Sequence, residues 1–241
     1  MTARDDETLD AALGGALRVI QHKKGYRFSL DAVLLADFVS PARGSVVDLG
    51  TGSGVVAMIV AHRSPDARVT ALELQPALAD RARRSVALNR LEQRVTVVEG
   101  DVRKLELPSR SFDLVVSNPP FQAASDRVSP NSERAHARHE LTYSLADLGP
   151  AAKHLLKPNG KLAVVYPATR LDEVLHAFVQ LGLSPTRLQL VHPRADEPAK
   201  MFLLEASLAE SRMNTLPPLV LHEPGARTYT PEAARILGER G

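Results

Sequence analysis

From residue 45 onward, segments whose hydrophobic positions have the pattern of a strand alternate with segments that have the pattern of a helix. Short apolar runs predict buried strands, and longer segments with apolar residues at helical spacing predict helices. The predicted strands are 45–49, 68–72, 94–98, 112–117, 161–165, 186–191 and 200–207, and the predicted helices are 55–63, 77–90, 145–156 and 171–181. One further predicted helix, 28–38, precedes them. Repeated β-α units of this kind predict a parallel sheet covered by helices on both faces.

The last two predicted strands have no helix between them, so we expect them to pair antiparallel at one edge. The fold class is therefore α/β, a doubly wound and mostly parallel sheet with an antiparallel edge strand. Asn159-Gly160 should end the preceding helix as a left-handed cap. The arginines of helix 77–90 are expected on a solvated face, and they are Arg81, Arg83, Arg84 and Arg90.

The two ends of the chain carry weaker patterns. The first 20 residues allow one amphipathic helix, and residues 22–27 form a short basic lead-in. Thr230-Pro231-Glu232 has the cap, the first-turn proline and the acid that begin a helix. Without repeats or low-complexity linkers, we expect one domain over residues 1–241. Its parts are a lead-in (1–27), a core (28–208) and a C-terminal extension (209–241).

Composition limits the class of protein. Apolar residues make up 44% of the 241 positions and charged residues 24%, as in an ordinary soluble globular protein. The absence of cysteine excludes disulfides and thiolate metal sites. No apolar run approaches the ~18 residues needed to cross a bilayer, and the acidic start does not resemble a signal peptide, so we expect a cytoplasmic protein. A net charge of +2 permits nucleic-acid binding only where basic residues cluster.

The first predicted strand runs into a glycine-rich turn, Asp48-Leu49-Gly50-Thr51-Gly52-Ser53-Gly54. Such a turn between a strand and a helix lets a ligand approach the backbone and points helix N–H groups at it. Position 55 is Val where the dinucleotide fingerprint has its third glycine, which weakens an NAD interpretation. A tight turn without any ligand is the alternative.

Polar side chains also end the next strands. Glu73 follows the second strand about twenty residues beyond the glycines, where an acid can accept hydrogen bonds from ribose hydroxyls. Asp101 follows the third strand, and Asn118 the fourth. Either acid by itself would be interpreted as a solvated loop residue. Because carboxyl ends of parallel strands share one edge of a sheet, the set together predicts a nucleoside site there.

The fourth strand runs into Asn118-Pro119-Pro120-Phe121, which carries the clearest chemistry. Consecutive prolines stop strand pairing and stiffen the backbone, and neither has an N–H, so carbonyl oxygens here are free acceptors. Asn118 adds a side-chain carbonyl, and Phe121 adds an aromatic face. This arrangement suits a planar group with an exocyclic NH2, such as a nucleobase. By itself, the tetrapeptide is equally compatible with a Pro-rich turn whose Phe fills the core.

Residues 48–54, Glu73, Asp101 and 118–121 resemble the ordered motifs of class I S-adenosylmethionine-dependent methyltransferases, whose fold is Rossmann-like. The Asn-Pro-Pro-Phe form resembles the subset that methylates adenine N6, guanine N2 and glutamine amides. Within this subset the chain is similar to the bacterial valine-tRNA adenine-N6 methyltransferase family over roughly residues 20–208. Two further stretches are similar to that family, 25–32 and 137–140.

The resemblance implies S-adenosylmethionine as the cofactor, S-adenosylhomocysteine as its product and tRNA as the partner, with no metal and no membrane. The implied cofactor contacts are Asp48, Gly50, Gly52 and Gly54 at the methionine end, Glu73 at the ribose, Asp101 and Val102 at the adenine, and a segment from Phe28 to Asp31 that closes the pocket. The implied catalytic residues are Asn118, Pro119, Pro120 and Phe121.

The expected reaction is an in-line displacement of the sulfonium methyl by the amine nitrogen. The Asn118 side-chain oxygen and the Pro119 carbonyl would accept the two N–H bonds and localise the nitrogen lone pair. Phe121 would stack on the flipped base, which is worth on the order of 1–3 kcal/mol.

The stretch 122–142 mixes basic and acidic side chains. We interpret it as a lid that grips the RNA backbone, and a solvated loop is the alternative. The predicted RNA contacts are Arg127, Arg134, Arg138 and His139. Two histidines among mixed charges do not make a metal site.

Other functions remain open. A protein glutamine methyltransferase shares the tetrapeptide, but that family typically has a helical domain before the core, whereas this core begins by about residue 28. A guanine-N2 enzyme acting on ribosomal RNA is a second alternative. From other classes, an NAD(P)-linked oxidoreductase is disfavoured by Val55, and an RNA-binding module without turnover is disfavoured by the intact Asn-Pro-Pro-Phe.

Overall fold

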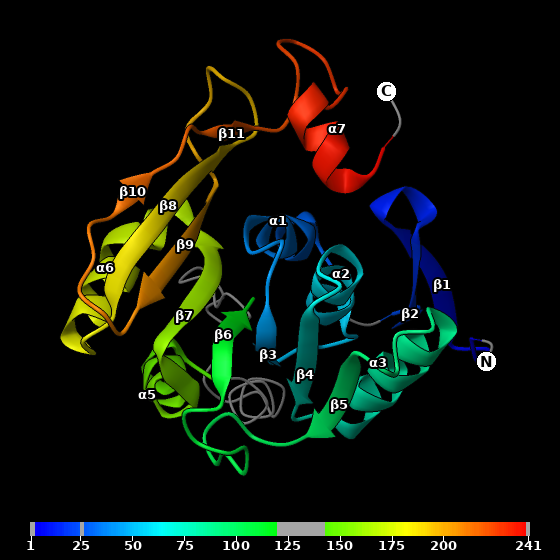
Figure 1. Cartoon of the computed structure of the whole chain (residues 1–241). Helices are drawn as coiled ribbons and strands as arrows, with labels where there is room; N and C mark the ends of the chain where they lie inside the picture. Colours follow the sequence, from blue (N-terminus) through cyan, green and yellow to red (C-terminus); the bar gives the residue numbers. More distant parts are fainter. Residues whose placement is uncertain (1–2, 25–26, 120–142, 240–241) are drawn as a thin grey trace, which may run out of the picture.

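The structure is a computed structural model that describes residues 3–24, 27–119 and 143–239 (Figure 1). Its strands are β1 (Glu7–Ala12), β2 (Leu17–His22), β3 (Gly44–Leu49), β4 (Ala67–Glu73), β5 (Val95–Glu99), β6 (Phe112–Ser117), β7 (Leu156–Pro167), β8 (Ser184–His192), β9 (Met201–Ser207), β10 (Asn214–Thr215) and β11 (Leu219–Val220). Its helices are α1 (Leu30–Phe38), α2 (Val55–Arg63), α3 (Pro76–Leu88), α5 (Leu145–Leu155), α6 (Leu171–Gln180) and α7 (Pro231–Leu237), with short 3-10 turns η1 (Leu13–Gly15) and η2 (Ala168–Arg170).

The main sheet has the strand order β10-β8-β9-β7-β6-β3-β4-β5, with β11 also paired to β8. Strands β5, β4, β3, β6 and β7 are parallel, and β9 is antiparallel to both of its neighbours, β7 and β8. The predicted doubly wound sheet and the antiparallel pairing of its last two long strands are confirmed. The sheet extends further than predicted, because β10 and β11 of the C-terminal extension pair with β8.

Two hydrophobic cores cover the two faces of this sheet. Helices α1, α2, α3 and α7 contribute to one core, and α5 and α6 contribute to the other. Helix α2 is apolar on all sides, and every residue from Val55 to Ala61 is buried, because the helix packs against both α1 and the strands of the sheet. The strands between the helix layers are correspondingly rich in Val and Leu.

The predicted N-terminal helix is wrong, because residues 7–22 form a β-hairpin. Glu7 pairs with His22 and Ala12 with Leu17, and the chain reverses through Gly14 and Gly15, whose φ angles are +60° and +92°. From Thr8 to Ala12, the side chains of β1 alternate between partly or fully buried and exposed positions, which is the period of a strand rather than of a helix. A Gly-Gly pair between two such runs is a hairpin signal.

The predicted helix cap at Asn159-Gly160 is also wrong. Helix α5 ends at Leu155, and β7 begins at the next residue. Pairing of β7 with β6 shifts register between Phe112 and Leu114, so residues 157–160 lie in an irregular part of the strand. A side chain on Gly160 would come within 2.9 Å of the Phe112 carbonyl oxygen. The glycine therefore permits close approach of two strands rather than a left-handed turn.

The C-terminal extension returns across the molecule to the hairpin (Figure 1). The predicted final helix is confirmed as α7, whose cap residue Thr230 accepts a hydrogen bond from the Ala233 N–H at 3.2 Å. Helix α7 packs against α1 and against η1 of the hairpin turn. Arg63 of α2 donates to the carbonyl oxygen of Ile236 at 2.5 Å. Both ends of the chain therefore support the same helix layer.

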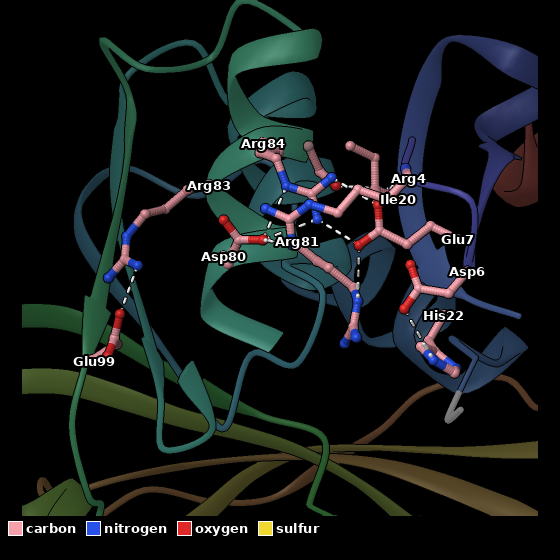
Figure 2. A network of polar contacts seen from close by, with 11 residues as sticks. Arg4, Asp6, Glu7, Ile20, His22, Asp80, Arg81, Arg83, Arg84 and Glu99 are labelled. Atoms are coloured by element: carbon pink, nitrogen blue, oxygen red, sulfur yellow. Dashed lines mark hydrogen bonds and ion pairs between the residues drawn. The ribbon is translucent and has the colours of Figure 1, made fainter. Parts of the chain in front are cut away.

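The hairpin is held on α3 by a network centred on Glu7 (Figure 2). The Glu7 carboxylate accepts hydrogen bonds from Arg84 and Arg81 of α3 and from the backbone N–H of Arg4. The side chains of Arg81 and Arg84 are only 14% and 11% exposed, so their predicted solvated position is wrong. Arg83, which is 45% exposed and pairs with Glu99, faces solvent as predicted.

Glu7 is itself buried, and its pKa is lowered to about 2, chiefly by the hydrogen bond from Arg84. Because this pKa lies below the ordinary value of 4.5, the interaction stabilises the fold fully above pH ~4.5. The stabilisation is then lost as the pH falls toward 2.

We therefore expect Glu7→Gln to lower the free energy of unfolding at pH 7 by on the order of 3 kcal/mol, because the largely buried Arg81 loses its carboxylate partner and Arg84 keeps only Asp80. The difference from the wild type should shrink as the pH falls from 4.5 to 2. Urea unfolding across this pH range measures it. The matched control is Glu99→Gln, which breaks only an exposed pair and should cost less than about 1 kcal/mol. Equal losses for the two variants would contradict the role given to Glu7.

Candidate functional site

The predicted functional side chains lie along one edge of the sheet. Strands β3, β4, β5 and β6 are parallel neighbours, so their carboxyl ends meet at that edge. Asp48 lies at the end of β3, Glu73 at the end of β4, Asp101 just after β5 and Asn118 just after β6. The structure thus brings together the four strand ends that the sequence singled out.

The glycine-rich turn after β3 requires its glycines. Gly50, Gly52 and Gly54 have φ angles of +69°, +61° and +84°, a region that other residues adopt only with strain. Gly54 is the cap of α2, and a side chain there would come within 3.2 Å of Ala82. A side chain on Gly52 would meet no atom of the described residues within 4 Å. The open side of the turn is therefore at Gly52.

Asp48 supports this turn from inside the protein. It is 1% exposed, and its carboxylate accepts hydrogen bonds from the Thr51 hydroxyl at 2.5 Å and from the Ala57 N–H at 3.2 Å. Burial raises the pKa of Asp48 to about 7. The carboxylate thus joins the turn to the first turn of α2 and fixes the path of the backbone that the glycines form.

Glu73 connects β4 to the same turn. One carboxylate oxygen accepts the Gly52 N–H at 2.8 Å, and the other accepts the Gln75 N–H at 2.9 Å. The side chain is 5% exposed, and burial raises its pKa. Two backbone hydrogen bonds fix the carboxylate beside the open side of the glycine turn, and its remaining lone pairs can accept hydrogen bonds from a ligand.

Asp101 has a partner that the sequence did not reveal. Arg103 donates from Nε and Nη2 to its carboxylate at 2.9 and 2.8 Å, and the Arg103 backbone N–H donates at 2.9 Å. The side-chain hydrogen bond from Arg103 lowers the pKa of Asp101. Asp101 is therefore an oriented carboxylate. Next to it, the predicted contact residue Val102 is 6% exposed.

A groove of about 350 Å³ begins at Val102 and runs along α5. Val102, Arg103 and Leu105 form one wall, and residues of α5 that include Ala146 and His154 form the other. No helix lies between β5 and β6 in the described residues, and the chain there forms turns with a bridge between Asp101 and Lys104. The groove thus adjoins the predicted adenine contacts.

Asn118 and Pro119 follow β6 directly. Asn118 is half-buried and Pro119 is buried, while Ser117 before them is fully buried. The predicted catalytic residues Pro120 and Phe121 lie outside the described residues. The predicted RNA contacts lie outside them too, and these are Arg127, Arg134, Arg138 and His139.

Phe28 and Asp31 lie at the amino end of α1. The other end of this helix is near the start of β8, because Arg187 stacks over the Phe38 ring with its guanidinium carbon 4.2 Å from the ring centre. Strand β8 runs parallel to β7 through β9, so α1 begins near the carboxyl edge of the sheet. The hairpin fixes the chain that leads into α1, since the Gln21 side chain accepts a hydrogen bond from the Phe28 N–H at 2.6 Å. Burial raises the pKa of Asp31. Pocket closure by these residues remains a prediction.

Sequence reasoning missed Tyr143. Its hydroxyl donates to the Leu49 carbonyl oxygen at 2.6 Å and contacts the Ser117 hydroxyl. Its ring packs on Gly50, where a side chain would come within 2.7 Å of it. Tyr143 is 94 residues from Leu49, so no local pattern could reveal the contact.

Comparisons with known proteins bear on this site. A family model described as "Methyltransferase small domain" matches residues 29–180. The "tRNA1(Val) (adenine(37)-N6)-methyltransferase" of Porphyromonas gingivalis is 34% identical over 222 residues, which are 87% of this chain and 86% of that protein. The chain belongs to this family of methyltransferases. A second relative with the same name, from Aeromonas hydrophila, is 37% identical over 72% of this chain and 73% of its own.

Solved structures agree with the methyltransferase fold. A crystal structure titled as a predicted O-methyltransferase, protein Atu636 from Agrobacterium tumefaciens, superposes with a TM-score of 0.70 at 27% identity. It covers 86% of this chain and 94% of its own. A geranyl diphosphate methyltransferase in complex with SAM has a TM-score of 0.55 at 14% identity over 74% of this chain and 84% of its own, which shows a common fold alone. The class I methyltransferase resemblance is thus confirmed, and the oxidoreductase alternative is rejected.

The described residues lack two further features. No cluster of three or more His, Cys, Asp or Glu side chains there is arranged to hold a metal ion. In the same residues, no helix is both long and apolar enough to cross a membrane.

Proposed function

We propose that this methyltransferase uses S-adenosylmethionine to methylate the exocyclic N6 of an adenine in tRNA, which would place the reaction in the cytoplasm. The observation that carries the proposal is the convergence of Glu73, Asp101 and Asn118 with the glycine turn on one edge of the sheet. The name of the Porphyromonas gingivalis relative, which matches 87% of the chain, supplies the substrate class.

The residues present fit the cofactor. The open side of the turn at Gly52 leaves space for a ligand against the backbone. The oriented Glu73 carboxylate has lone pairs available for ribose hydroxyls beside that space. Asp101 is suited to accept a hydrogen bond from an adenine amine, because Arg103 keeps it ionised and occupies only part of its acceptor capacity. When bound, S-adenosylmethionine supplies a methyl group activated by its positive sulfur.

The residues after β6 fit an amine acceptor. An adenine N6 lone pair is delocalised into the ring, so the nitrogen is a poor nucleophile. We expect the Asn118 side-chain oxygen and the Pro119 carbonyl to accept its two N–H groups, which localises the lone pair and orients the nitrogen. This is catalysis by positioning and electrostatics from fixed groups of the protein.

A guanine-N2 ribosomal RNA methyltransferase and a protein glutamine methyltransferase use the same kind of acceptor group. The adenine-tRNA relatives favour the first proposal, since the chain spans 86% of the Porphyromonas gingivalis protein. Transfer of a tritiated methyl group to separate tRNA, ribosomal RNA and protein fractions distinguishes the three. We expect label in tRNA, recovered after digestion as N6-methyladenosine. Label confined to another fraction would reject the tRNA assignment.

For the proposed catalytic residues after β6, we expect Asn118→Ala to reduce methyl transfer by at least about 100-fold, because the amine loses a preorganised hydrogen-bond acceptor. The affinity for S-adenosylhomocysteine should stay within about twofold of the wild type, because Asn118 is proposed to grip the acceptor. Single-turnover transfer and calorimetry measure the two effects. Asn214→Ala, on the exposed strand β10, is the matched control and should transfer normally. Near-wild-type turnover of Asn118→Ala would reject the assignment.

For the ribose contact, we expect Glu73→Ala to raise the dissociation constant for S-adenosylhomocysteine by about 10- to 100-fold, because charge-assisted hydrogen bonds to the ribose are lost. Calorimetry with the free enzyme measures it. Glu99→Ala is the matched control, because Glu99 pairs in register with Glu73 but is exposed and bound to Arg83. Unchanged affinity in a folded Glu73→Ala protein would contradict the ribose role.

A further inference from the structure

The two halves of the site lie on strands that separate just before reaching it. Pairing of β3 with β6 continues to Asp48 and Val116 and then stops. The next residues are Leu49, which leads into the glycine turn, and Ser117, which leads into Asn118. Beyond this last pair, backbone pairing between β3 and β6 no longer fixes the distance between the glycine turn and Asn118.

Two hydroxyl groups join the strands at this fork. The Leu49 carbonyl oxygen accepts hydrogen bonds from the Tyr143 hydroxyl at 2.6 Å and from the Ser117 hydroxyl at 3.2 Å. The two hydroxyls also contact each other. The two hydroxyls thus give hydrogen-bond partners to the Leu49 carbonyl, which lies just beyond the last β3–β6 pair. They also link the end of β3 to the end of β6.

The tyrosine ring adds a steric constraint to these hydrogen bonds. It packs directly on Gly50, where even a Cβ atom would clash at 2.7 Å from the ring. Gly50, the first glycine of the turn, is thus restrained by contact with the Tyr143 ring and by the hydrogen-bonded Leu49 carbonyl that precedes it. Because the fork is fixed by three groups in contact, movement of Tyr143 would shift the glycine turn and Asn118 relative to each other.

We propose that Tyr143, acting with Ser117, is a positioning residue for methyl transfer, a strut that sets the separation of Asn118 from the glycine turn. This inference rests on the proposed methyl-transfer function. The strut itself touches neither the methyl group nor the amine. Its contribution is alignment, and displacing reacting groups by about 1 Å can cost roughly 100-fold in rate.

A different role for the same ring would be a plug that fills part of the cofactor site. The geometry favours the strut, because Tyr143 covers Gly50 while the open side of the turn lies at Gly52. The hydroxyl is also satisfied by groups of the strand ends rather than directed into open space. A plug must leave before the cofactor binds, whereas a strut stays in place.

Tyr143→Phe tests the proposal, because it keeps the ring on Gly50 and removes only the hydroxyl. We expect kcat to fall by about 10- to 100-fold, while KM for tRNA and the dissociation constant for S-adenosylhomocysteine change by less than about threefold. Ser117→Ala should act in the same direction. The double variant should be little worse than the slower single variant, because the two hydroxyls act as one unit. Tyr229→Phe, in the C-terminal extension, is the matched control and should keep wild-type kinetics.

Hydrogen exchange of the free enzyme gives a second readout that does not depend on the substrate. In Tyr143→Phe, amide exchange should become faster in peptides covering 49–54 and 116–119, with no change in peptides of α3 and with the melting temperature close to that of Tyr229→Phe. Unchanged exchange in both site peptides would overturn the strut even if the wild type methylates another substrate. Unchanged kcat in an active enzyme, or tighter cofactor binding in Tyr143→Phe, would also overturn it, the latter in favour of the plug. A wild type that labels no tRNA would reject the proposed function separately.

Discussion

The parallel pairing of β3 with β4 on one side and β6 on the other is the constraint on which the site depends. Each parallel strand delivers its carboxyl end to the same edge, so residues far apart in the chain meet there. Glu73 makes the connection explicit, since its carboxylate binds the Gly52 N–H across the β3–β4 boundary. Without this register the glycine turn, the two acids and Asn118 would be unrelated loop residues.

The remainder of the fold holds these strands in place from both faces. Helix α2 is buried against the sheet and α1, and α1, which also contacts β7 and β9, is in turn contacted by α7 from the C-terminal extension. The N-terminal hairpin is fixed to α3 by Glu7 and by the Ser85 hydroxyl, which accepts the Ile20 N–H at 2.9 Å. The hairpin also binds the chain leading into α1 through Gln21. Both ends of the chain therefore contact either α1 or the segment before it, which is predicted to close the pocket.

Sequence patterns predicted the parts of the fold that depend on local periodicity. The β-α units were placed within a few residues because central strands such as β3 and β6 are buried on both faces and therefore appear as continuous apolar runs. The hairpin was missed because its alternation is short, and only Gly14 and Gly15 distinguish it from a helix. Gly160 was misinterpreted because a glycine that admits a neighbouring strand looks in sequence like a glycine that caps a helix.

The residues of the candidate site also fall into a group that the sequence predicted and a group that it did not. Residues at strand ends were predictable, because the end of a buried run is visible in the sequence. Their partners were not. Arg81 and Arg84 reach the buried Glu7, and Tyr143 meets Leu49, which lies 94 residues before it in the chain. Such contacts depend on the tertiary path of the chain, which no local period encodes.

A crystal structure of the enzyme with S-adenosylhomocysteine tests the central claim most directly. The account predicts the ribose hydroxyls on Glu73, the adenine beside Asp101 and Val102, and the sulfur facing Asn118 across the open side of the turn at Gly52. A ligand bound away from the carboxyl edge of β3 and β4, or an Asn118 side chain directed away from the sulfur, would contradict it.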